Sequence, residues 1–251
     1  MSKRFISLFL LITLALFLTA CDQIVIQGPL SSNMVRGSGN VISETRSVSG
    51  FDSVAFTGSG EATITLGDTE NVVVEADDNI LPLIETTVQN GKLTIGLKPN
   101  TSISTSRGIR YTVNARTLTA VETSGSSNIT VNSPVEADAF SATTSGSGHI
   151  QLSELQAGKF DCRTSGSGNI TASGKVDSLN ASTFGSGNLT FGNLQSAAVN
   201  ATTSGSGNIT VWATTSLDAR TSGSGSVHYY GQPSVNRSES GSGRVTGLGN
   251  Q

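Results

Sequence analysis

The tripeptide Gly-Ser-Gly recurs along the chain at a nearly constant interval, and this repeat limits the possible fold more than any other feature. From the variant Gly-Ser-Ser at Gly125 onward, successive repeats are 18 to 21 residues apart. An interval of this size is typical of a solenoid, in which each coil packs only on its neighbours. The first glycines of the Gly-Ser-Gly repeats are Gly37, Gly58, Gly146, Gly166, Gly185, Gly205, Gly223 and Gly241.

The coils share an alternating pattern of apolar and polar residues when they are aligned on the first glycine. Positions six and four residues before this glycine, and four and six after it, are apolar or small, as in Phe160, Cys162, Ile170 and Ala172. The positions between them hold Ser, Asp, Asn, Gln, Thr or His. Because alternate residues of a strand face the same side, we expect the first set to point inward and the second to face water.

A single coil cannot be stable alone, because about four inward side chains do not outweigh the backbone entropy of ordering some twenty residues. Stability has to come from coils stacked about 4.8 Å apart. The sequence therefore predicts an all-β fold, a β-solenoid of about 18–21 residues per coil with a less regular N-terminal β portion.

The corner of each coil is predicted at the repeat itself. We expect its glycines to supply the positive φ that a sharp turn needs. The position after the corner is asparagine in most coils, with His149 an exception, and Asn128, Asn169, Asn188 and Asn208 are predicted to form a structural turn ladder with hydrogen bonds from coil to coil.

The regions outside the regular coils carry weaker signals. Strand-like runs lie between Phe51 and Leu97, and Asn90-Gly91 predicts a type I′ hairpin. Residues 98–108 are polar and are expected to form a surface loop. In the last coil, Arg237 replaces an inward alanine and Glu239 replaces a recurring threonine, as expected where a stack meets water.

The first residues have the parts of an export signal. Lys3 and Arg4 precede an apolar run over 5–18, and Leu18-Thr19-Ala20-Cys21 resembles the lipobox of bacterial lipoproteins. We expect a signal peptide over 1–20, a lipidated Cys21 with a tether over 21–36, and a β-solenoid domain over 37–251. The membrane is then a partner through the lipid on Cys21. The alternative is an ordinary secretory signal that ends near a cysteine.

Charge and cysteine content limit the partners and the cross-links. Removal of residues 1–20 leaves 13 basic against 18 acidic side chains, a net charge of about −5, which argues against nucleic acid as a partner. Cys162, in a column of alanines, is expected to be a buried small residue, and after lipidation of Cys21 it has no cysteine to pair with.

Catalytic, cofactor and metal sites find little support. Asp161 and Asp218 lie three coils apart, about 14 Å along the axis, which is too far for a glycosidase pair. His149 and His228 lie in different columns of different coils, and no cofactor is predicted. Trp212 occupies an outward position and is the best candidate for a surface contact. The alternative is a turn residue that packs on its own coil.

The chain resembles the "head GIN" domain family, whose function is not established. The match runs from Phe51-Asp52-Ser53-Val54 through 72–77 and 91–95 to the Gly-Ser-Gly-Asn coils. The resemblance implies a β-helical protein of the bacterial cell envelope, which we expect to face the periplasm or the exterior. The family also carries an adhesin label, which is inherited from its architecture.

We expect a non-catalytic envelope lipoprotein that binds a polysaccharide or an envelope protein. The alternatives are a structural or stress-related lipoprotein without a specific ligand and, with less support, a polysaccharide-active enzyme.

Overall fold

The computed structural model describes residues 34–105 and 107–251. The expected signal peptide, Cys21 and most of the tether lie outside the described residues. In the described part the regular elements are β-strands, apart from one 3-10 turn, η1 (Leu81–Leu83). No helix among them is long and apolar enough to cross a membrane.

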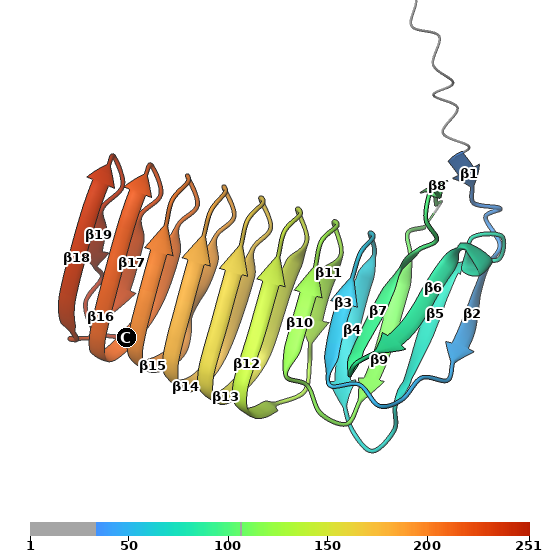
Figure 1. Ribbon diagram of the computed structural model, residues 1–251, viewed down its shortest axis with the longest axis horizontal. Helices are drawn as coiled ribbons and strands as arrows, with labels where there is room; N and C mark the ends of the chain where they lie inside the picture. The colour runs from blue at the N-terminus through green and yellow to red at the C-terminus, as the bar shows by residue number, and fades with distance from the viewer. Residues whose placement is uncertain (1–33, 106) are drawn as a thin grey trace, which may run out of the picture. The chain divides into compact units, whose positions relative to one another are not determined.

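The coils stack side by side, as Figure 1 shows from green to red. Strands pair in parallel with the equivalent strands of the next coil, so that Phe140 lies opposite Phe160, and Cys162 opposite Ala181. The predicted β-solenoid is confirmed. Its coil strands are β10 (Ala120–Thr123), β11 (Asn128–Val131), β12 (Val135–Thr144), β13 (His149–Thr164), β14 (Ile170–Thr183), β15 (Leu189–Thr203), β16 (Ile209–Gly223), β17 (Val227–Tyr230), β18 (Ser234–Gly241) and β19 (Val245–Gly247).

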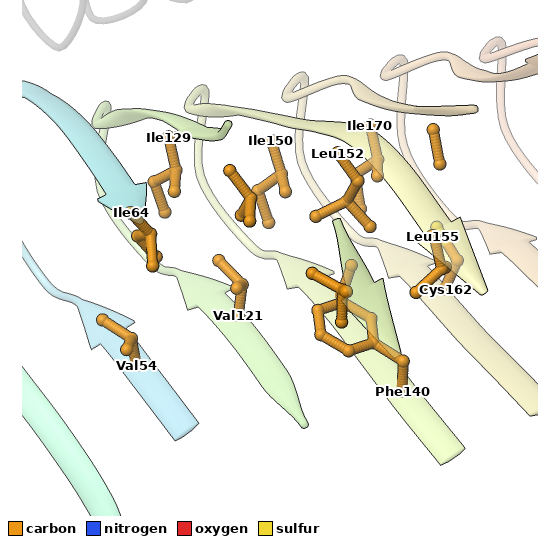
Figure 2. Packing of buried hydrophobic residues seen from close by; sticks show 14 of the residues in the cluster. Val54, Ile64, Val121, Ile129, Phe140, Ile150, Leu152, Leu155, Cys162 and Ile170 are labelled. Atoms are coloured by element: carbon orange, nitrogen blue, oxygen red, sulfur yellow. The ribbon is translucent and has the colours of Figure 1, made fainter. Parts of the chain in front are cut away.

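Each coil has two sides, which we call the first side (the strand segment before the corner) and the second side (the segment after it). Inward side chains of the two sides point toward one another, as Figure 2 shows for Val121 and Phe140 opposite Ile129 and Ile150. The predicted inward columns are buried, except for Val235 and Tyr229 near the last coil. Phenylalanine rings of successive coils also touch within this core.

The corners of the middle coils contain glycine because neighbouring coils approach closely there. The reason expected from the sequence, positive φ, is wrong for these coils. Between Gly125 and Gly205 the first glycines do not adopt left-handed φ, although Gly223 and Gly241 do. Instead, a Cβ added to Gly166 would overlap the carbonyl oxygen of Gly146 in the preceding coil. That oxygen accepts hydrogen bonds from the N–H groups of Ser167 and Gly168, both at 3.0 Å.

A buried threonine completes each of the middle corners from inside. The Thr183 hydroxyl donates to the carbonyl oxygen of Gly187 at 3.0 Å, and Thr203 does the same to Gly207 at 2.8 Å. This bond satisfies a hydroxyl that would otherwise be buried without a partner. The threonine and the Gly-Ser-Gly that follows it two positions later therefore hold the corner together.

The N-terminal portion is assembled out of sequence order. The coil formed by β3 (Ser53–Phe56) and β4 (Glu61–Leu66) lies between β10 and β11 on one side and β7 (Lys92–Leu97) and β9 (Arg110–Ala115) on the other. Beyond these, β6 (Ile84–Gln89) pairs antiparallel with β7, β5 (Asn71–Asp77) with β9, and β2 (Val41–Arg46) with β5. Antiparallel strands thus cover this end of the parallel stack.

The β6–β7 hairpin is the one predicted at Asn90-Gly91. Both residues have positive φ, 50° and 76°, as a type I′ turn requires. The loop expected over 98–108 contains a short strand, β8 (Ser102–Ser104), which pairs in parallel with β1 (Met34–Arg36). Residues 34–36, expected to belong to the tether, are therefore part of the folded domain.

Gly37 begins a Gly-Ser-Gly-Asn segment that is not a coil corner. The segment lies between β1 and β2, where the Gly39 N–H donates to Asp77 Oδ1 at 2.7 Å and the Ser38 hydroxyl to Asp78 Oδ1 at 2.5 Å. Bonds from Ser38 and then Asn40 lower the pKa of the Asp78 carboxyl. The first corner of the stack is at Gly58, whose neighbour in the next coil is Gly125.

In the last coil, two polar side chains bond to backbone groups that in earlier coils bond to the following coil. The Val245 N–H donates to Glu239 Oε1 at 2.7 Å, whereas the equivalent N–H of Val227 donates to a carbonyl of the next coil. The Arg244 guanidinium donates to the carbonyl oxygens of Gly241 and Gly243 at 3.2 and 2.7 Å. The end of the stack therefore has its own hydrogen-bonding caps.

Candidate functional site

The asparagine column lies at the start of each second side. The Asn188 N–H donates to Asn169 Oδ1 at 2.7 Å, and the Asn208 N–H to Asn188 Oδ1 at 2.9 Å. At the other end, Asn128 Nδ2 donates to Glu61 Oε1 at 2.9 Å. Each bond between asparagines joins the backbone N–H of one residue to the side-chain oxygen of the asparagine in the preceding coil. The column therefore satisfies a backbone N–H group next to the corner. Its geometry describes scaffold rather than a binding surface.

Trp212 lies near the far end of a second side, where β16 bends toward the first side. It is half-buried and in register with Tyr230 of the next coil, on the adjacent strand β17. Its ring lies beside Gly231, where an added Cβ would be 3.5 Å from Trp212 Cδ1. The next coil thus holds the indole in place while part of it stays in contact with solvent.

Tyr230 extends the same surface over the preceding coils. A Cβ added to Gly192, two coils earlier in the same column, would lie 3.3 Å from Tyr230 Cε2. The phenol ring therefore occupies space that a larger side chain at 192 would fill. Trp212 and Tyr230 together present two aromatic rings on a surface that is otherwise rich in Thr, Ser and Asn.

Asn193 follows Gly192, the residue that lies beside the Tyr230 ring. Gln251 Nε2 donates to Asn193 Oδ1 at 3.1 Å, although the two residues are 58 positions apart. Asn193 lies in an irregular segment, because the register between β15 and β16 shifts between Phe191 and Gln195. We call Trp212, Tyr230, Asn193 and Gln251 the aromatic patch. Alignment of the coils finds Trp212, but the contact between the amides depends on this shift and on the last residue, which column alignment does not predict.

The described residues offer no evident catalytic or metal centre. Residues 34–105 and 107–251 contain no group of three or more His, Cys, Asp or Glu side chains able to hold a metal ion. Asp161 and Asp218 each pair with a basic neighbour, Lys159 at 2.7 Å and Arg220 at 2.9 Å. Cys162 is buried as expected, and burial raises the pKa of its thiol well above the usual value. A neutral, enclosed thiol is a poor nucleophile.

The comparisons with known proteins agree with this architecture. Residues 50–233 match the family model described as "Putative auto-transporter adhesin, head GIN domain". A solved structure of a putative adhesin from Bacteroides fragilis is 24% identical with a TM-score of 0.82, covering 85% of this chain and 100% of that one.

Two solved structures from Parabacteroides distasonis have the same fold. A putative adhesin is 26% identical with a TM-score of 0.71, covering 86% of this chain and 100% of that one. A putative lipid binding protein is 24% identical with a TM-score of 0.71, covering 86% and 99% of the two chains. No match is found among the curated proteins.

Proposed function

This chain belongs to the head GIN domain family, and on that premise we propose that it is a non-catalytic protein of the bacterial cell envelope that binds polysaccharide through its aromatic patch. The proposal includes attachment to a membrane through lipid on Cys21. The adhesin descriptions of the family and of its solved relatives support a role in surface binding.

The pairing of Trp212 with Tyr230 is the observation that carries the proposal. The two lie opposite each other on adjacent parallel strands, so their backbones are about one strand spacing apart. Sugar rings present C–H faces that pack on aromatic rings and hydroxyl groups that bond to amides, and Asn193 and Gln251 supply such amides. Because Trp212 and Tyr230 lie on paired strands, little ordering entropy of these two residues opposes binding.

A glycan array tests this function. We expect the native protein to bind one or more glycans, and Trp212→Ala and Tyr230→Ala to weaken binding about tenfold, the equivalent of roughly 1.4 kcal/mol. Thr171→Ala is the matched control, because Thr171 faces outward on the same side of an earlier coil. Trp212→Phe should restore part of the affinity, which separates loss of an aromatic contact from loss of stability.

Other results would contradict the proposal or favour a different function. Absence of glycan binding by the native protein would contradict the proposal. Pull-down of a defined envelope protein that depends on Trp212 would then identify a protein ligand, and absence of both would favour a structural or stress-related role. Release of product from a polysaccharide panel would contradict the non-catalytic part.

Membrane attachment has a separate test. The residues before Cys21 supply the lipobox-like motif that supports it. Cys21→Ser should abolish incorporation of a labelled fatty acid and move the protein out of the membrane fraction. Unchanged labelling would contradict attachment at Cys21 and leave glycan binding unaffected.

A further inference from the structure

A second polar surface lies on the first side of the coils, away from the aromatic patch. It is a shallow hollow of about 260 Å³ lined by Ser141, Thr143, Asp161, Arg163, Asn180 and Ser182. These residues belong to three successive coils, in β12, β13 and β14. Nothing in the repeat requires an ionic group at this place.

One side chain next to this hollow, Phe184, departs from the column that it occupies. Phe184 is 43% exposed in the column that directly precedes the corner glycine, where the other coils from β10 onward carry serine. Arg163 stands in a mixed column, where its neighbours Thr143 and Ser182 are small and polar and where Arg220 is a second arginine. The Arg163 Cζ lies 4.3 Å from the centroid of the Phe184 ring, a cation–π contact. The exceptional Phe184 ring therefore lies against the Arg163 guanidinium.

Asp161 does not neutralise Arg163. Its Oδ2 accepts from Lys159 Nζ and its Oδ1 from Asn180 Nδ2, both at 2.7 Å. Partial burial acts to raise the pKa of the Asp161 carboxyl, but the bonds from Lys159 and Asn180 and the charge of Lys159 outweigh it and lower the pKa. The carboxylate is thus ionised and already engaged on both oxygens.

Arg163 consequently remains available for an external anion. No described residue forms an ion pair with it, whereas Arg220 in the same column pairs with Asp218. Lys159, Arg163 and Asp161 together leave one net positive charge here, on a chain whose formal net charge is −3. The contact with Phe184 restrains the guanidinium and leaves its edge free for two parallel N–H···O bonds.

We propose that this hollow binds a carboxylate-bearing sugar unit of an acidic polysaccharide. Arg163 holds the carboxylate, the Phe184 ring orients the guanidinium, and Asn180, Ser141 and Ser182 bond to hydroxyl groups of the sugar. This site lies on the first side of the coils and does not rest on the aromatic patch. A chain bound here runs across neighbouring coils, because the lining residues do.

Binding of uronic acid polymers to the full mature chain tests the proposal. The probes are polygalacturonate, alginate and hyaluronate at about 0.15 M salt, where long-range charge effects are screened. The matched ligand is methyl-esterified polygalacturonate, which keeps the sugar and loses the charge. We expect measurable binding of at least one acid polymer and at least tenfold weaker binding of its ester or carboxyl-reduced form. Dextran sulfate is included to separate carboxylate recognition from general attraction of anions.

The variants restore residues that other coils already use. Arg163→Thr should reduce affinity at least tenfold and Phe184→Ser several-fold, because Thr and Ser occupy these columns elsewhere. Arg220→Thr removes the same charge from the same column three coils away and should leave affinity unchanged. Circular dichroism and thermal unfolding verify that each variant is folded.

Several results would overturn this site. They are absence of binding to all three acid polymers, equal binding of the neutral form or of dextran sulfate, and equal effects of Arg163→Thr and Arg220→Thr. Trp212→Ala should keep this binding. Loss of acid-polymer binding in Trp212→Ala with full binding in Arg163→Thr would instead assign the ligand to the aromatic patch.

Discussion

The carbonyl oxygen of the first corner glycine is the atom on which each joint between coils depends. It accepts from two N–H groups of the next coil, and the glycine of that coil packs directly on it. The residue type is therefore set by a neighbour about 20 positions away. This explains why sequence reasoning found the glycine but gave the wrong cause: a repeated Gly-Ser-Gly is compatible with left-handed φ and with close stacking alike, and only the stacked backbones distinguish them.

Two glycine-to-alanine variants test this cause. Gly166→Ala should lower the free energy of unfolding by about 1–3 kcal/mol, because its Cβ overlaps Gly146 O and backbone must shift. Gly58→Ala should be nearly neutral, because a Cβ there has no atom within 4 Å. Urea denaturation of both variants measures the difference. Equal losses would refute close approach as the reason for glycine.

Strands of the regular coils could be predicted because period-two patterning survives in each coil and is repeated in register. The same reasoning found the hairpin at Asn90-Gly91. It did not find that β3 and β4 lie between strands that come later in the sequence, because alternation indicates which side faces inward but not which strand is adjacent. The contact between Asn193 and Gln251 in the aromatic patch was also not predicted, because the register shifts beside Asn193 and the alternating pattern does not indicate such a shift.

Adjacent residues in β14 test the register. Ile170→Asp places a charge in the core, where Ile170 is fully buried, and should cost about 4 kcal/mol or more. Thr171→Asp points to solvent and should change the free energy of unfolding by roughly 0.5 kcal/mol or less. Thermal unfolding followed by circular dichroism compares the two. Similar melting temperatures would contradict the assigned faces.

The described domain ends in two different ways along the stack. Antiparallel strands cover the N-terminal end, and side chains of Glu239 and Arg244 occupy the backbone groups of the last coil. The antiparallel strands end the parallel stack at one end, and at the other the two side chains satisfy backbone groups that could otherwise pair with another copy of the chain. An uncapped solenoid edge is a template for association, so these polar residues matter for the whole molecule more than for their own coil.

Restoring the repeat in the last coil tests the role of its caps. The double variant Glu239→Thr with Arg244→Asn leaves the Val245 N–H and the corner carbonyls without their side-chain partners. We expect a loss of about 1 kcal/mol or less in stability, because the coil is exposed, but concentration-dependent association in sedimentation experiments. Ser238→Thr on the same strand is the control. A double variant that stays monomeric would assign these residues no capping role.

The coil of β3 and β4, which pairs only with later strands, limits the order in which the chain can fold. Residues 53–66 form their pairs only with segments between 92 and 131, so a chain that emerges N-terminus first must wait for more than half its length before this coil closes. We expect this closure to be slow, because it pairs segments that are far apart in the sequence. After this closure, each later coil can pair with the strands of the coil that precedes it in the sequence.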